Sequence, residues 1–151
     1  MDLHPWGYSI FEDFPASTLI SAERYLTTQV ATANGKQITG YCFDIDNDTV
    51  WLEGTGEMIV AFNSAGMESE AAFYLAEMEK MILDSDLFEE SAGIPYATNR
   101  ATSYGSGDLW FGVDTNAAIS SSAWYLFGKT EFNPFAVGRE KNAPVADKFW
   151  Q

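Results

Sequence analysis

An acidic and aromatic run between residues 44 and 53 holds the densest group of side chains able to do chemistry. Asp44, Asp46 and Asp48 alternate there, and Trp51 and Glu53 follow. Hydrolysis of a glycosidic bond needs two carboxyl groups, one that protonates the leaving oxygen and one that acts as base or nucleophile. The axial C–H surface of a pyranose ring is apolar, so sugars also stack on aromatic rings. The run therefore indicates a carbohydrate site.

Three carboxylates are candidate catalytic residues. Glu53 stands in the first turn of a predicted helix beside an indole ring, where the helix dipole alone also favours a carboxylate. Asp48 belongs to the acidic run, and Asp108 precedes Leu-Trp, where a turn aspartate is equally expected. The candidate substrate-binding residues are four aromatic side chains: Trp51, Tyr96, Trp110 and Trp124. Trp51 and Trp124 also suit a hydrophobic core, so both roles stay open for them.

The alternating aspartates also suggest a calcium loop. An EF-hand loop that began at Asp44 would need glycine at its sixth position and glutamate at its twelfth. Thr49 and Thr55 occupy those positions, so the EF-hand pattern fails. Asx turns and a helix cap explain the same aspartates without an ion. We therefore expect no metal and no cofactor, with an irregular calcium site as the alternative.

The remaining polar residues exclude several kinds of site. His4 is the only histidine and lies in an N-terminal segment that we expect to fray, which argues against a Ser–His–acid triad. Cys42 is the only cysteine, so it forms no internal disulfide and belongs to no structural zinc set. We expect it to be a small buried hydrophobic residue. The sequence has no phosphate-binding P-loop and no dinucleotide fingerprint.

The composition indicates one folded domain with a neutral or cationic ligand. The 151 residues include 11 Phe, 7 Tyr and 5 Trp, enough for a core, and carry a formal net charge of -14. This charge repels phosphate backbones and anionic lipids, so we expect neither nucleic acid nor a membrane as partner. The N-terminus lacks the basic and apolar regions of a secretory signal. A complete chain would be cytoplasmic on this ground, and the location is otherwise open.

Helical spacing of apolar residues predicts four helices that would position these side chains. They span residues 15–31, 50–63, 68–83 and 116–127, with a short extended piece at 36–43 and a long loop at 84–115. Gly54 and Gly56 fall in the second helix, where the missing side chains indicate a close neighbour, either a helix or a ligand. We expect a single helical domain over residues 1–135 and a C-terminal tail over residues 136–151.

Several short motifs follow one another in a defined order along residues 43–135. They are DTVWLEGT at 48–55, a glycine at 66 before a helix, GIPYA at 93–97, SAWYLF at 122–127 and NPF at 133–135. Together they resemble the C-terminal part of six-hairpin glycosidase-like proteins, in which inner and outer helices alternate around a ring. The resemblance implies an all-α fold, with antiparallel helical hairpins that form part of an α/α toroid and long aromatic loops.

The resemblance also implies a ligand and a place for it. The ligand class is an oligosaccharide or polysaccharide, held near the Trp51–Glu53 turn and the loops around Tyr96 and Trp110. Glu53 would act as general acid or grip sugar hydroxyls. Because the chain is shorter than a complete ring, apolar flanks would be exposed, and we expect a homo-oligomer or association with a missing toroid half.

Two functions therefore stay open. The first is a carbohydrate-active protein that binds an oligosaccharide with Glu53 in the cleft and, as an enzyme, is a glycoside hydrolase. The second is a noncatalytic helical binding or assembly module that lost or never had hydrolase activity.

Overall fold

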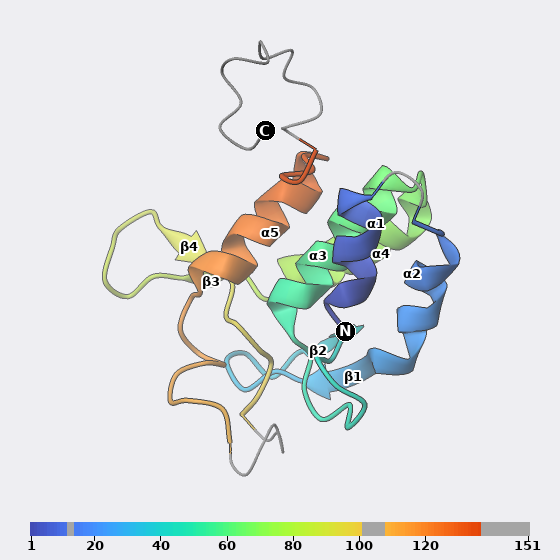
Figure 1. The fold of residues 1–151 in the computed structure, drawn as a ribbon. Coiled ribbons are helices and arrows are strands. Elements are labelled where there is room, and N and C mark those ends of the chain that lie inside the picture. The colour runs from blue at the N-terminus through green and yellow to red at the C-terminus, as the bar shows by residue number, and fades with distance from the viewer. Residues whose placement is uncertain (12–13, 101–107, 137–151) are drawn as a thin grey trace, which may run out of the picture.

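The computed structural model describes residues 1–11, 14–100 and 108–136. Five α-helices lie in this part: α1 (Leu3–Ile10), α2 (Ser17–Ser21), α3 (Leu52–Ser64), α4 (Glu68–Glu79) and α5 (Ile119–Lys129). A 3₁₀ turn, η1 (Ala22–Tyr25), follows α2. The strands are β1 (Leu26–Val30), β2 (Gln37–Tyr41), β3 (Leu83–Asp84) and β4 (Ala92–Gly93). Figure 1 shows α1, α3, α4 and α5 packed together, with the β1–β2 hairpin across one end.

The expected all-α fold is wrong, because the structure also contains two antiparallel two-stranded sheets. The expected helix over residues 15–31 ends early, and its second half becomes β1. This stretch reads LTTQV, and its three β-branched residues lose rotamer freedom in a helix but fit a pleated strand. The structure is therefore a small mixed α/β domain and not an arrangement of helical hairpins alone.

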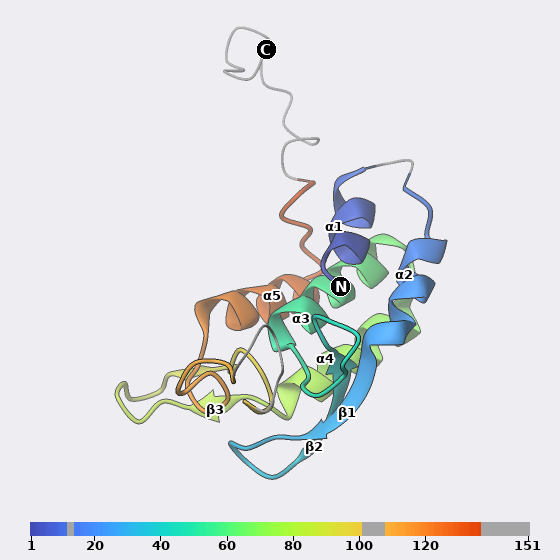
Figure 2. The same cartoon turned by 60° about the horizontal axis from the view of Figure 1, so that its bottom comes forward.

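The β1–β2 hairpin lies against the helices. Its register pairs Thr28 with Thr39, and Gly35 takes a φ of +70° in the connecting turn, which a glycine tolerates without strain. The extended piece expected at residues 36–43 is confirmed as β2. On its edge, the Thr39 amide donates to the Glu77 carboxylate of α4 at 2.8 Å. Figure 2 shows the hairpin curving along the outside of α4.

Helix α3 is the centre of the core and packs on α1, α4 and α5. From Leu52 to Phe62 all its residues are buried except Glu53. The close neighbour expected from the glycines is present, since a Cβ on Gly56 would lie 2.7 Å from the Cβ of Trp124 on α5. The other expected helices are present with shifted ends. Helix α4 ends at Glu79 and not at residue 83, and Leu83–Asp84 form β3.

Helix α1 was not expected from the sequence. Its short sequence contains Pro5 and Gly7, both poor helix formers. Asp2 stabilises its start, because the carboxylate accepts a hydrogen bond from the Leu3 amide at 3.1 Å. The expected tail lies, apart from Ala136, outside the described residues. Within the described chain, no helix combines the length and the apolar character needed to cross a bilayer.

Candidate functional site

Three of the aromatic side chains proposed for ligand binding come together in one pocket of about 280 Å³. Trp51 immediately precedes α3, whereas Tyr96 and Trp110 lie in the loops between β4 and α5. The ring centroids of Trp51 and Tyr96 are 6.1 Å apart, and those of Tyr96 and Trp110 are 4.9 Å apart. The residues that line the pocket are Asp2, Phe43, Trp51, Tyr96, Leu109 and Trp110.

Backbone hydrogen bonds tie these segments to one another. The Trp51 amide donates to the Tyr41 carbonyl at 2.8 Å, and the Leu52 amide donates to the Tyr96 carbonyl at 2.9 Å. The Tyr96 amide in turn donates to the Val113 carbonyl at 3.0 Å. The end of β2, the start of α3 and the two later loops are therefore held in register around the pocket.

The aromatic side chains of the pocket differ in solvent exposure. Trp51 is only 7% exposed and forms the inner wall, whereas Trp110 is 57% exposed and forms the rim. The six-membered ring of Trp51 faces the Gly54 backbone, and its indole nitrogen is buried without a hydrogen-bond partner in the described structure. An unsatisfied buried donor costs about 1–3 kcal/mol.

Trp124, the fourth aromatic candidate, lies in a different cluster. It sits on α5, where its ring is 5.5 Å from Phe127 and 5.8 Å from Phe135, centroid to centroid. Phe135 also contacts Trp6 of α1. This second cluster joins α5 to α1 and to the chain after α5. Trp124 therefore packs against Phe127 and Phe135 and lies outside the pocket.

The three carboxylates proposed for catalysis are on separate segments. Glu53 lies in the first turn of α3 and is half-buried. Asp48 is in the loop before α3, and its backbone carbonyl accepts a hydrogen bond from Asn99 at 3.2 Å. Asp108 is exposed and stands two residues before the pocket residue Trp110. None of the three lines the aromatic pocket in the described structure; Asp2 does.

Glu57 is a functional candidate that the sequence reasoning missed. It lies one turn after Glu53 on α3 and is 1% exposed, and the Trp6 indole is close to its carboxyl group but not placed for a regular hydrogen bond. Burial raises the pKa of its carboxyl to about 8; the Trp6 indole opposes this shift, and the charges of Glu53 and Asp2 add to it. In the sequence, Glu57 is marked only as a charged residue that follows Gly54 and Gly56 and begins an apolar stretch of the predicted helix.

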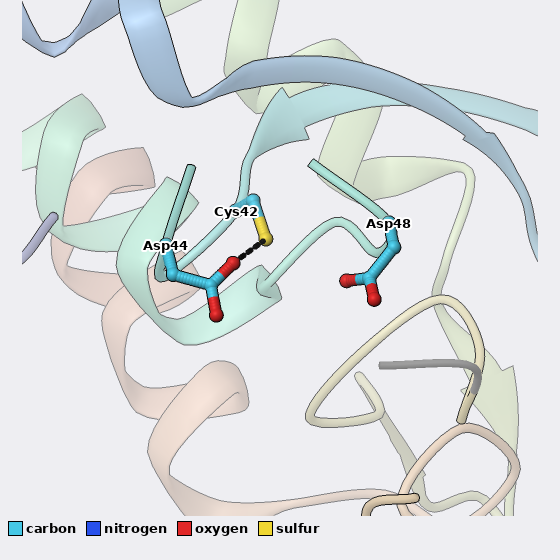
Figure 3. Close-up of side chains that lie close together, drawn as sticks. All are labelled: Cys42, Asp44 and Asp48. Carbon is cyan, nitrogen blue, oxygen red and sulfur yellow. Dashed lines mark hydrogen bonds between the residues drawn. The ribbon is translucent and has the colours of Figure 1, made fainter. Parts of the chain in front are cut away.

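The aspartate loop forms a compact cluster with Cys42 (Figure 3). The candidate ligand atoms of Cys42, Asp44 and Asp48 all lie within 4.8 Å of one another. The thiol donates to Asp44 Oδ1 at 3.4 Å, and burial raises the pKa of this thiol, which keeps its proton in place. A protonated thiol is a poor metal ligand. The hydrogen bond between Cys42 and Asp44 therefore helps to hold the loop in place.

The metal-free explanation of the aspartates holds in part. Asp44 Oδ1 accepts a hydrogen bond from the Asp46 amide at 3.2 Å, which is an Asx turn. The expected helix cap is wrong, since the residue that caps α3 is Trp51 and no side chain caps it. The Thr49 hydroxyl instead lies 3.3 Å from the Thr98 hydroxyl, and this contact helps to bind the acidic loop to the segment that carries Tyr96.

Comparison of the chain with known proteins found no matching family model, no matching curated protein and no matching solved structure.

Proposed function

We propose that this protein binds a saccharide in the pocket between Trp51, Tyr96 and Trp110. The observation that carries the proposal is the convergence of three aromatic rings from separate segments on one pocket of about 280 Å³. Aromatic rings match the apolar C–H faces of a sugar ring, and burial of those faces drives binding. The resemblance of the sequence to six-hairpin glycosidase-like proteins favours the same class of ligand.

The size of the pocket supports a short ligand. Sites for drug-sized molecules span roughly 300–1,000 Å³, so this pocket lies just below that range and suits one sugar ring with the rest of the chain outside. The exposed Trp110 at the rim offers a face for a second ring.

Hydrolysis is a second candidate function, favoured by one observation. Glu57 holds its proton near neutral pH, as a general acid must, and Glu53 lies one helical turn away. A pair of carboxyl groups in such different environments is the arrangement that acid and base roles need. Helix α1 closes over Glu57, however, and Asp2 is the one carboxylate among the described residues that line the pocket. Binding without hydrolysis is therefore the function that we propose first.

Isothermal titration calorimetry with cello-, chito- and xylo-oligosaccharides tests the binding proposal. We expect Trp110→Ala to weaken binding about tenfold or more, because it removes the rim of the pocket. The matched control is Phe111→Ala, which removes a neighbouring ring that is 86% exposed and does not line the pocket. Equal losses in the two variants, or no binding of any oligosaccharide, would contradict the proposal.

An assay of reducing-sugar release distinguishes the two functions. If the protein only binds saccharide, neither the wild-type protein nor Glu53→Gln releases reducing sugar. If Glu53 is a catalytic residue, the wild-type protein releases it and the variant does not. Release of reducing sugar by the wild-type protein, lost in Glu53→Gln, would favour the hydrolase.

A further inference from the structure

The rings of the pocket form walls around a space instead of one flat platform. Phe43 meets Trp51 at an interplanar angle of 67°, Trp51 meets Tyr96 at 51°, and Tyr96 meets Trp110 at 49°. Each ring is therefore turned about half a right angle or more from its neighbour. The face of an aromatic ring carries partial negative charge, and several faces around one space attract an organic cation. We call these tilted rings around one pocket the aromatic cage.

The charge at the mouth of the cage has the matching sign. Asp2 lines the pocket, and its side chain is 45% exposed. Its two recorded contacts, with the Leu3 amide at 3.1 Å and with the amino group of Met1 at 3.6 Å, both use Oδ1. Neither contact uses Oδ2, which stays available to a cation. Glu53, two residues after Trp51, adds a further negative charge to this end of α3.

The Met1 ammonium, 3.6 Å from Asp2 Oδ1, partly balances the charge of Asp2, but cationic side chains are kept away from the pocket. Across residues 1–11, 14–100 and 108–136, no lysine or arginine lines it. The nearby Arg100 donates from Nε to the Leu109 carbonyl at 3.3 Å, and its guanidinium lies over the Phe111 ring, 5.8 Å from the centroid. With a net charge of -14 on the whole chain, the surroundings disfavour an anionic ligand.

From this combination we infer that the pocket selects a sugar that carries a protonated amine, such as a glucosamine unit, over neutral and acidic sugars. The inference rests on the proposed saccharide site and specifies its ligand. The ammonium group would enter the cage between Trp51, Tyr96 and Trp110 and meet the Asp2 carboxylate, while the apolar face of the ring packs on the exposed indole of Trp110.

The test compares matched disaccharides by calorimetry at pH 6. The probes are the β-1,4 dimer of glucosamine, cellobiose as its neutral counterpart, cellobiouronic acid as an anionic one, and tetramethylammonium chloride as a cation without a sugar. We expect the glucosamine dimer to bind about tenfold more tightly than cellobiose, the effect of a desolvated cation–π contact. Cellobiouronic acid should bind most weakly, and tetramethylammonium should compete with the glucosamine dimer.

Asp2→Asn provides the second readout. Asparagine still caps α1 but removes the charge, so the affinity for the glucosamine dimer should fall several-fold more than the affinity for cellobiose. The matched control is Asp86→Asn, an exposed aspartate in the β3–β4 loop that changes the net charge equally. A preference that survives Asp2→Asn, or falls equally in both variants, would overturn the role of Asp2.

The outcomes separate this inference from the proposed function. Equal binding of cellobiose and the glucosamine dimer would overturn the inference and leave saccharide binding intact. Binding of tetramethylammonium with no binding of either sugar would overturn both, since the cage would then serve another organic cation. No binding of any probe would contradict the proposed site itself.

Discussion

Glu57 has its carboxyl group in an apolar environment. It is 1% exposed, and the nearby Trp6 indole makes no regular hydrogen bond to it, so the charged form is disfavoured. The pKa of its carboxyl rises from an ordinary 4.5 to about 8 in the folded protein. Between pH 4.5 and pH 8, the Glu57 carboxyl group is deprotonated in the unfolded chain but still protonated in the folded protein. This contribution to stability is therefore complete below pH 4.5 and is lost as the pH rises toward 8.

We expect Glu57→Gln to stabilise the protein at alkaline pH. The loss in the wild-type protein is at most about 1.4 kcal/mol per pH unit between the two pKa values, so the variant should gain a few kcal/mol at pH 8 and almost nothing at pH 4.5. Thermal unfolding followed by circular dichroism at both pH values measures this, with Glu70→Gln on the exposed face of α4 as control. A gain of the same size at both pH values would show that Glu57 is not the titrating group.

The sequence predicted the residue types of the pocket better than their arrangement. Trp51, Tyr96 and Trp110 were identified because indole and phenol rings suit sugars, and the structure brings them together. Nothing in the residue types separates Trp124 from them, because its position depends on how α5 packs against Gly56. Glu57 was missed because burial of a carboxyl group depends on α1, which the sequence pattern did not predict.

At the scale of elements, the contact between α3 and α5 depends on glycine. The Cβ of an alanine at position 56 would lie 2.7 Å from the Cβ of Trp124 and 3.1 Å from its backbone carbon. A main-chain neighbour cannot move aside without moving the whole helix, so overpacking of this kind costs about 1–3 kcal/mol. The gain in helix propensity from alanine, about 1 kcal/mol, does not offset it.

We therefore expect Gly56→Ala to destabilise the protein by about 1–2 kcal/mol in urea unfolding monitored by fluorescence. Gly128→Ala on α5 is the comparison, because its new Cβ would meet Ile59 Cγ2 at 2.6 Å and Ile59 Cβ at 3.2 Å in the same helix contact. Ile59 is fully buried and β-branched, so it cannot turn aside and we expect a loss of similar size. No loss of stability in either variant would contradict this explanation of the helix contact.

The sequence pattern located α3, α4 and α5, but helical spacing misled where it disagreed with the local preference for a strand. Residues 26–30 continue the helical spacing of the preceding segment, yet their threonines and valine form β1 because β2 is available to pair with them. This pairing partner lies beyond the Asn34–Gly35 turn, and a pattern within one segment does not reveal it. Strand pairs as short as β3 and β4 carry no periodic signal at all.

On the scale of the whole molecule, one face carries several exposed apolar side chains. Leu87 and Phe88 in the β3–β4 loop are 85% and 68% exposed, and Ile119 on α5 is 90% exposed. They surround the connected pockets beside Ala92 and Gly93. Figures 1 and 2 both place this loop beside the start of α5. Exposed apolar surface of this kind favours association, so the expectation of a homo-oligomer remains a prediction.

Static light scattering at micromolar concentration checks this prediction. The net charge of -14 on each copy opposes association, so we expect the oligomer to be favoured by salt that screens the charge. The double variant Leu87→Ser, Phe88→Ser should shift the protein toward the monomer, whereas Leu3→Ser, at an apolar residue of α1 that is 76% exposed, should not. A strictly monomeric wild-type protein at high salt would contradict the prediction.

The most direct test of the saccharide site follows the indole N–H signals by NMR during titration with an oligosaccharide. The account predicts that the Trp51 and Trp110 signals shift with one common binding curve, while the signals of Trp6 and Trp124, in the separate aromatic cluster, stay in place. Shifts confined to Trp6 and Trp124, or no shift of any indole signal at millimolar sugar, would contradict it.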